Sequence, residues 1–387
     1  MISNIEELSY LTLSDIHFGH GTNPTEEIVR NIDVFFDDYT SKSQFCDLDI
    51  IFIAGDMFDR LLDSSSDDVH AVMLWLGRLS GFCLRHDIKL RILEGTPSHD
   101  WKQSKIACTL QEILSNSVDF KYIEDIHIES FKDSQSRIFY VLYIPDEITG
   151  SAKETLRRVK TLMESTGIEK VDIAIMHGMF HYQLPDGIGN VQKHDEDEYL
   201  SLVKHFINIG HIHTHSVYDR IIAQGSFDRL AHGEEEAKGA VLCRISKVNG
   251  NSFYFIENKR AKIYRTIVLK TKDLDRSLVQ IEKVIAKIPN NSHIRIKAAK
   301  DHPLYMAFED LKIKYPMFYF KKASIEDEEE NYVLVKQNIV QDETYIPITI
   351  QKENIVDLLM TEVQNEYQLP SVKLIALRDL LESTNGR

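Results

Sequence analysis

Five short segments of the chain place histidine and aspartate directly after runs of apolar residues. In chain order they are Asp15-Ile16-His17, Gly55-Asp56-Met57-Phe58-Asp59, Gly95-Thr96-Pro97-Ser98-His99-Asp100, His177-Gly178 and Gly210-His211-Ile212-His213. Imidazole and carboxylate ligands together suit Mn, Fe or Zn, whereas carboxylates alone would indicate Mg or Ca. Residues i and i+2 of an extended segment point the same way, so Asp15 and His17 can present two donors to one place. His211 and His213 have the same spacing, and the pattern predicts a metal centre.

Each segment alone is weak evidence for such a centre. A lone histidine after a strand is more often a hydrogen-bonded structural residue, and a lone Gly-Asp pair is more often a turn. Five such segments, all at the ends of predicted strands, are hard to attribute to chance. Open α/β sheets bind ligands beyond the carboxyl ends of their strands, so these loops can converge on one site.

The elements that must position these residues alternate along the chain from Tyr10 to about Ile256. Apolar runs predict strands at Tyr10–Leu13, Asp49–Ala54, Lys89–Leu93, Ile138–Ile144, Asp172–Met176 and Phe206–Ile209. Helical spacing predicts helices at Thr25–Tyr39, Asp67–His86, Ser104–Leu114 and Ala152–Ser165. The runs Ala240–Ile245 and Ser252–Ile256, separated by Asn249-Gly250, are typical of a hairpin. The alternation indicates a layered α/β domain, which we place at residues 1–258.

Two further regions follow this domain. Residues 259–325 predict a small α+β module, with strands at Tyr264–Leu269, His293–Ala298 and Met317–Lys322 and helices at Asp273–Lys287 and Leu304–Tyr315. Residues 326–387 begin with an acidic connector, Glu326–Glu330, and end in two amphipathic helices, Asn354–Tyr367 and Ser371–Glu382. Terminal helices of this kind either pack back on their own domain or bind a partner.

The composition is that of a folded protein of two or three domains. The 387 residues are 43% hydrophobic and 27% charged, which argues against a mostly disordered chain. No apolar run approaches the roughly 18 residues of a membrane helix, so no membrane partner is expected, and the N-terminal segment lacks the basic region of a secretory signal. The four cysteines (Cys46, Cys83, Cys108 and Cys243) form no CxxC pair. We therefore expect neither a disulfide framework nor a zinc ribbon, and a reducing, cytoplasmic location.

The net charge of −15 is distributed unevenly. Residues 259–322 hold 16 Lys and Arg against 6 Asp and Glu, a local excess of +10. Such a segment is either a solvated face or a surface for nucleic-acid phosphates, and charge alone leaves both open. The acidic runs Asp195–Glu198, Glu234–Glu236 and Glu326–Glu330 are expected to be solvated faces or loops.

The ordered set of segments resembles the calcineurin-like metallophosphoesterases, and more closely their SbcD-type nuclease branch, relatives of the double-strand-break repair nucleases. Three features carry the closer resemblance: Asp15-Ile16-His17-Phe18-Gly19, Gly55-Asp56-Met57-Phe58-Asp59, and Gln224-Gly225-Ser226-Phe227-Asp228-Arg229-Leu230 followed by an acidic run and Lys238-Gly239. The resemblance covers residues 10–245. It implies an α/β fold with a layered β-sandwich core flanked by helices, a small capping domain that contacts DNA, and a C-terminal helical pair that grips an SbcC-type coiled-coil ATPase.

The resemblance also implies roles for individual residues. It implies two divalent metal ions, most readily Mn, with Asp15, His17 and His213 at one site, His177 and His211 at the other, and Asp56 bridging both. His99 would stabilise or protonate the departing oxygen, and Asp100 would fix its ring. Asp59 is expected to lie next to a metal ligand but not to bind the metal itself. Three further histidines are close in sequence to this set and are expected to be polar lining or surface residues: His20, His181 and His215.

One segment departs from the family pattern. The family usually has Gly-Asn-His-Asp in the third motif, with the asparagine oxygen binding the second metal. This chain has two extra residues there, and Ser98 stands where the asparagine would be. A hydroxyl is a poorer ligand than an amide carbonyl, so the second ion would bind weakly, use water or draw on Thr96. We predict an active site with an asymmetric metal pair.

The leading hypothesis is a Mn-dependent nuclease subunit that hydrolyses DNA phosphodiester bonds in repair or recombination, as a homodimer with an SbcC-type ATPase. The alternative is a metallophosphoesterase for small phosphate esters or phosphoproteins, for which the basic module and the terminal helices have no obvious use. A third possibility, motivated by Ser98, is a scaffold that holds metal but does little chemistry.

Overall fold

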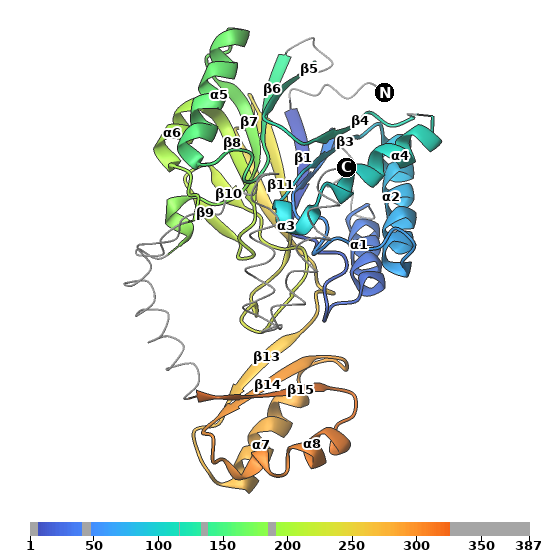
Figure 1. Cartoon of the computed structure of the whole chain (residues 1–387), viewed down its shortest axis with the longest axis vertical. Coiled ribbons are helices and arrows are strands. Elements are labelled where there is room, and N and C mark those ends of the chain that lie inside the picture. Colours follow the sequence, from blue (N-terminus) through green and yellow to red (C-terminus); the bar gives the residue numbers. More distant parts are fainter. Residues whose placement is uncertain (1–6, 41–47, 116, 133–137, 185–190, 326–387) are drawn as a thin grey trace, which may run out of the picture. The chain divides into compact units, whose positions relative to one another are not determined.

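The computed structural model describes residues 7–40, 48–115, 117–132, 138–184 and 191–325 (Figure 1). The chain divides into two compact units, Met1–Asn331 and Tyr332–Arg387. The second unit lies outside the described residues, and so do Cys46, the acidic connector and the two terminal helices that the sequence predicts. Cys83, Cys108 and Cys243 are free thiols. In the described part of the chain, no helix combines the length and the apolar character needed to cross a membrane.

Two six-stranded sheets form the main domain (Figure 1). The first has the order β12 (Ser252–Glu257), β11 (Gly239–Ser246), β1 (Glu7–Leu13), β2 (Ile50–Ala54), β3 (Lys89–Leu93) and β4 (Phe120–Ile123). The second has the order β5 (His127–Lys132), β6 (Ile138–Ile144), β7 (Val171–His177), β8 (Val203–Gly210), β10 (Ile221–Ala223) and β9 (Ser216–Tyr218). Strands β1 to β4 pair in parallel, as do β6, β7, β8 and β10, and antiparallel strands close the edges. The predicted layered α/β core and its β11–β12 hairpin are confirmed.

Alternating side chains divide the core of this domain into layers. On β2, Ile50 and Phe52 pack between the two sheets, whereas Ile51 and Ile53 pack on the outer face. The outer face of the first sheet is covered by α1 (Thr25–Thr40), α2 (Asp67–His86) and α4 (Ile106–Ile113), and that of the second by α5 (Ala152–Thr166) and α6 (Glu196–Leu202). Both faces of each central strand are therefore buried, which explains their nearly continuous apolar sequences.

Short polar residues set the starts of the helices. The side chains of Ser66, Ser151 and Asp195 accept hydrogen bonds from backbone N–H groups in the first turns of α2, α5 and α6. The acidic run Asp195–Glu198 is thus the capped start of α6, and its side chains are exposed or half-buried, as expected of a solvated face. Negative charges in the first turn of a helix also interact favourably with its dipole.

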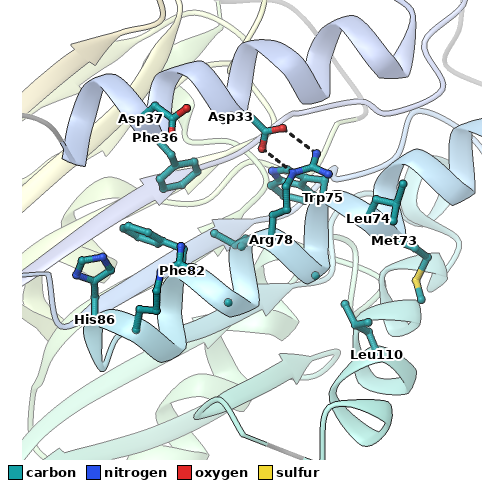
Figure 2. A pocket seen from close by; sticks show the side chains of 14 residues that line it. Asp33, Phe36, Asp37, Met73, Leu74, Trp75, Arg78, Phe82, His86 and Leu110 are labelled. Atoms are coloured by element: carbon teal, nitrogen blue, oxygen red, sulfur yellow. Dashed lines mark hydrogen bonds and ion pairs between the residues drawn. The ribbon is translucent and has the colours of Figure 1, made fainter.

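A cavity of about 780 Å³ lies between α1 and α2 (Figure 2). Phe36 and Phe82 line it, and the Arg78 guanidinium pairs with Asp33, with Nη2 and Oδ2 2.7 Å apart. It contains none of the residues that the sequence predicts for the metal centre.

The small module is built from β13 (Tyr264–Val268), α7 (Leu274–Ile285), β14 (His293–Ala298), α8 (Phe308–Lys314) and β15 (Tyr319–Ser324). Both helices pack on one face of its three-stranded sheet and enclose a core of their own. All three strands pair in parallel. The predicted elements are present, but the module is an alternating βαβαβ unit and not an α+β arrangement, because each helix connects two neighbouring parallel strands.

A buried ion pair joins the two sheets of the main domain. Arg91 on β3, 1% exposed, donates from Nε and Nη2 to the two carboxylate oxygens of Glu129 on β5, at 2.9 and 3.0 Å. The Tyr143 hydroxyl donates to the same carboxylate at 2.9 Å. Burial alone would raise the pKa of Glu129, but the hydrogen bonds from Arg91 and Lys121 lower it.

We expect Arg91→Met to lower the free energy of unfolding by about 3 kcal/mol, because it leaves the buried Glu129 charge without its main partner. Urea unfolding followed by circular dichroism measures this change. Because the folded-state pKa of Glu129 is depressed, its stabilisation is present above its unfolded pKa of about 4.3 and is lost as the pH falls. In Arg91→Met, the free energy of unfolding should therefore fall less steeply as the pH is lowered through the acid range. Arg78→Met, at an exposed ion pair, should change the free energy of unfolding by no more than about 1 kcal/mol and leave its pH dependence as it is.

Candidate metal centre

The loops after five parallel strands of the two sheets meet at one edge of the sandwich. The histidines and aspartates gathered there are Asp15 and His17 after β1, Asp56 after β2, His99 after β3, His177 at the end of β7, and His211 and His213 after β8. Their donor atoms form three overlapping groups, and within each group all lie within 4.8 Å of one another. The structure thus brings together all six predicted metal ligands and His99.

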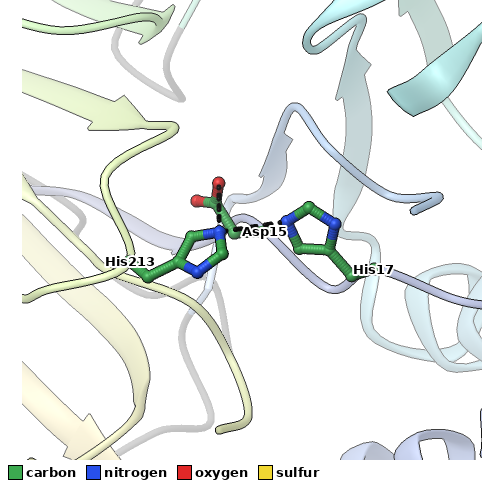
Figure 3. Close-up of side chains that lie close together, drawn as sticks. All are labelled: Asp15, His17 and His213. Atoms are coloured by element: carbon green, nitrogen blue, oxygen red, sulfur yellow. Dashed lines mark hydrogen bonds and ion pairs between the residues drawn. The ribbon is translucent and has the colours of Figure 1, made fainter. Parts of the chain in front are cut away.

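The first group consists of Asp15, His17 and His213 (Figure 3). The Nε2 atoms of the two histidines lie 3.1 Å apart, and His213 Nε2 lies 3.9 Å from Asp15 Oδ1. Donors that share one cation at 2.0–2.2 Å lie about 3 Å apart. Two imidazoles and a carboxylate at this spacing fit a divalent transition metal.

The second group consists of Asp56, His177 and His211. The His177 Nε2 atom lies 3.2 Å from Asp56 Oδ1, and the other oxygen of Asp56 lies 3.8 Å from His17 Nε2. Asp56 is 1% exposed and faces both groups, which is the position that a bridging carboxylate requires. The donor set therefore fits two cations.

Partners behind the imidazoles fix which nitrogen faces the centre. His177 Nδ1 donates to the Ala54 carbonyl at 2.7 Å, so its Nε2 is left for Asp56. His17 Nδ1 lies 3.2 Å from Asp59 Oδ1, and His213 Nδ1 lies 3.0 Å from Glu234 Oε1. The outer hydrogen bonds of His177 and His213 are of the kind that orients metal-binding histidines and fixes their tautomer, and Asp59 lies at ion-pair distance behind His17. Asp59 thus lies behind the predicted ligand His17, as expected from the sequence.

The role of Glu234 was not predicted, because the acidic run Glu234–Glu236 was expected to be a solvated face or loop. Besides His213, Glu234 contacts the almost fully buried Lys238, with Oε2 and Nζ 3.1 Å apart, and Lys238 also pairs with Glu236. Burial alone would raise the pKa of Glu234, but the hydrogen bond with His213 and the Lys238 charge lower it to about 2. The run lies in a loop, as expected, but it is not simply solvated, since Glu234 and Glu236 neutralise a buried lysine.

The charges of the centre stabilise one another. Burial raises the pKa of Asp56, but the His177 charge and the hydrogen bonds from His177 and His99 hold it well below its usual value. Burial lowers the pKa of His177 and His213, but neighbouring carboxylates raise both.

The backbone at the centre is strained. Four of the candidate ligands have left-handed backbone conformations, with φ of 50° at Asp15, 54° at His17, 47° at Asp56 and 95° at His211. Such conformations cost on the order of 1–3 kcal/mol each and concentrate at functional sites.

Close packing at the centre also requires glycine. Gly55 has a φ of 84°, and a Cβ there would lie 2.2 Å from His177 Nδ1. A Cβ on Gly95 would lie 2.1 Å from the Asp56 amide nitrogen. The two glycines therefore allow the β2 and β3 loops to approach the ligands closely.

The structure distinguishes Thr96 from Ser98 in the departing third segment. Ser98 is exposed, whereas Thr96 is 8% exposed and its Oγ1 lies inside the second group. That oxygen is 3.2 Å from Asp56 Oδ2, 3.2 Å from His211 Nδ1 and 3.5 Å from His177 Nε2. Thr96, and not Ser98, lies where an additional ligand would be needed.

Asp146 lies beside the second group, next to His211, and was not predicted from the sequence. Its Oδ2 lies 3.2 Å from both Thr96 Oγ1 and His211 Nδ1. The signal that could have found it is its place two residues after strand β6, at the same sheet edge as the other donors. A carboxylate here offers the second cation the charge that a threonine hydroxyl lacks.

We expect Asp146→Asn to weaken the binding of one of two Mn²⁺ ions by about 10- to 100-fold, because the substitution keeps the shape of the side chain and removes its charge. Isothermal titration of the metal-free protein with Mn²⁺ measures both affinities. The exposed neighbour supplies the control, since Glu147→Gln should leave both affinities unchanged. Two unaltered sites in Asp146→Asn would show that its carboxylate does not serve the metal.

His99 and Asp100 have separate surroundings. The His99 side chain is 39% exposed, and its Nδ1 lies 2.9 Å from Asp56 Oδ2. Asp100 is fully buried, and its oxygens accept backbone N–H groups of Phe58 and Gly95, each at 2.8 Å. The expectation that Asp100 fixes the His99 ring was wrong, because consecutive residues of the short helix α3 (Pro97–Asp100) point about 100° apart. Asp100 instead ties the β2 loop to the β3 loop.

The remaining nearby histidines have other environments. His215 Nδ1 donates to the Ala223 carbonyl at 2.7 Å, and His181 is exposed. His20 lines a cleft beside the centre, where burial lowers its pKa.

No family model and no curated protein matches the chain. Among solved structures, it is similar to TT1561 of Thermus thermophilus, with a TM-score of 0.37 and 12% identity, over 64% of this chain and 98% of that chain. It is also similar to GAP50, the anchor in the inner membrane complex of Plasmodium, with a TM-score of 0.39 and 13% identity, over 73% of this chain and 95% of that chain. These values do not assign the chain to a family.

Proposed function

We propose that the chain is a metal-dependent phosphodiesterase that cleaves DNA, as an SbcD-like nuclease subunit in repair or recombination. The observation that carries this proposal is the position of Asp56, which belongs to the second donor group and lies 3.8 Å from His17 of the first, at the meeting edge of two sheets. A carboxylate between two cations about 3.5–4 Å apart is the arrangement used for in-line displacement at phosphorus. The ordered segments that resemble the SbcD branch support the same assignment.

When bound, two divalent cations, most readily Mn²⁺, would polarise the phosphodiester and lower the pKa of a water molecule. Asp15, His17 and His213 would hold one ion, and His177 and His211 the other, with Asp56 facing both. Thr96 and Asp146 add oxygen donors beside His211. The loops of β1, β2, β7 and β8 thus fix the reacting groups in place.

In this proposal, His99 donates a proton to the oxygen that leaves the phosphorus. Its ring is the most exposed of the donors around Asp56, so a substrate can reach it from solvent. Its Nδ1 is engaged by Asp56, which leaves Nε2 to donate a proton to the leaving group. The hydrogen bond with Asp56 raises the pKa of His99, against the opposing effect of burial, and so favours the protonated form.

The +10 segment and the two C-terminal helices predicted from the sequence support DNA and an ATPase as partners. Clustered cations attract the phosphate backbone, and a stand-alone phosphatase for small esters has no use for them. We propose that residues 354–382 bind an SbcC-type coiled-coil ATPase, and that the nuclease works as a homodimer.

Incubating the protein with radiolabelled DNA and with bis-p-nitrophenyl phosphate, each with and without Mn²⁺, tests the activity. We expect Mn²⁺-dependent cleavage of DNA, stimulated by ATP when the partner is recovered from the native source. Hydrolysis of the small ester alone would support a phosphoesterase without a DNA role, and no hydrolysis of either would support a metal-holding scaffold.

A further inference from the structure

Four aromatic rings form a column on the small module and the adjoining loop of the main domain. His232 meets Tyr264 edge-on, with ring centroids 5.0 Å apart. Tyr264, His293 and Tyr319 then stack in succession, with centroids 4.7 Å apart and ring planes 27° and 25° from parallel. These three residues are register partners across β13, β14 and β15, so the strand spacing sets the ring spacing.

The column ends on an open ring. Tyr319 lies on the edge strand β15 and is 56% exposed. In the part of the chain that the structure describes, no further ring contacts its outer face. The column lies on the face of the sheet opposite α7 and α8, because Ile294 and Ile296 point into the helix-covered core and His293 points the other way.

Two cations lie next to the column on the same face. Arg295 and Lys321 follow His293 and Tyr319 by two residues and are register partners of each other. Among the described residues, neither has a carboxylate within ion-pair distance. Glu235, the nearby acid, is engaged by Arg265 and by the Thr266 amide. With burial, the two cations lower the pKa of His232 to about 4, so its ring is neutral at pH 7.

The column borders a cleft that also reaches the loop after β1. The cleft has a volume of about 420 Å³, and its lining includes Tyr264, Tyr319, Arg295 and His20. His20 lies on the loop after β1 that also carries His17. The cleft therefore connects the column with the loop of a predicted metal ligand.

We propose that an unpaired nucleotide of a DNA single strand stacks on the outer face of Tyr319 as the next ring of the column, with Arg295 and Lys321 contacting its phosphates. The proposal rests on the proposed function and specifies its substrate as a strand with unpaired bases. Bases inside a duplex have both faces covered and only the pair at an end has one face free, so away from the ends only an unpaired base can extend the column. A protein segment would offer rings without the regular negative charge favoured by two cations that have no carboxylate partner among the described residues.

Fluorescence anisotropy with a fluorescein-labelled 15-residue oligothymidylate, in EDTA so that cleavage cannot occur, measures this binding on the full chain. We expect Tyr319→Leu to weaken binding roughly tenfold and Tyr319→Phe to restore it, since a base needs the ring and not the hydroxyl. Lys321→Gln should also weaken binding and lower its salt dependence by about one phosphate contact. Lys322→Gln, on the opposite face of the same strand near Phe308, should have no effect.

Three results would overturn the proposal: wild-type affinity in Tyr319→Leu, no recovery in Tyr319→Phe, or an equal loss for a blunt duplex of the same length. Loss of affinity in Lys321→Gln alone would show attraction of phosphates without stacking. Because these measurements need no metal, their failure leaves hydrolysis at the metal centre untouched. Failure of Mn²⁺-dependent cleavage would leave the binding results standing.

Discussion

Replacing Asp56 by asparagine is expected to abolish Mn²⁺-dependent DNA cleavage, with a loss on the order of a thousandfold or more. The carboxylate is 1% exposed, and its two oxygens face His177 on one side and His17 and His99 on the other. Asparagine keeps the shape of the side chain but removes the negative charge that faces His177 of one donor group and His17 of the other. Isothermal titration should show that Mn²⁺ binding weakens at both sites together, unlike in Asp146→Asn.

The control is an aspartate close in sequence but exposed. Asp63 lies in the loop before α2, where it accepts hydrogen bonds from Ser65. Asp63→Asn should bind two Mn²⁺ ions and cleave DNA as the unaltered protein does. An Asp56→Asn variant that keeps either tight metal site and its activity would show that Asp56 does not bridge.

His99→Ala is expected to lower the rate of DNA cleavage by about 10²- to 10⁴-fold while DNA and partner binding stay largely intact. The reason is that His99 lies at the exposed rim of the centre, and the two metal groups keep all their other donors without it. Single-turnover cleavage with saturating Mn²⁺ separates the chemical step from metal binding.

His70→Ala supplies the matched control, because His70 lies exposed on α2. It should change neither the cleavage rate nor the affinity for DNA. Unchanged cleavage in His99→Ala would refute the role assigned to its imidazole. Loss of cleavage together with loss of Mn²⁺ binding would reassign His99 to the metal ligands.

The buried parts of the fold were predictable from sequence. Strand β3 and helix α2 have the predicted boundaries, since a central strand buried on both faces and a long amphipathic helix carry strong periodic signals. The edge strand β5 was not predicted, because its sequence His127–Lys132 alternates polar and apolar residues over only a few positions. Helix α6 was not predicted, because its N-cap, Asp195, lies within a run of acidic residues and was read as part of that run.

The candidate site was predictable where a donor belongs to a recognisable segment. Asp15, His17 and Asp56 do, and the structure places them together. Asp146 carries no local motif, and the acidic run that contains Glu234 does not show which side chain it meets. Only the fold brings these two carboxylates to His211 and His213. The role expected for Asp100 depended on its adjacency to His99 in sequence, and the geometry of one helical turn separates the two side chains.

The two sheets contribute donors in comparable measure, and this has a consequence for how such a chain can evolve. The loops of β1 and β2 supply Asp15, His17 and Asp56, while β7 and β8 supply His177 and the pair that follows β8. Neither sheet alone holds all the donors of either group, because Asp15, His17 and Asp56 follow strands of the first sheet and His177, His211 and His213 follow strands of the second. A gene fragment that encodes only one of the two sheets would therefore lose both donor groups, so the two halves of this domain have to be inherited together for the centre to persist.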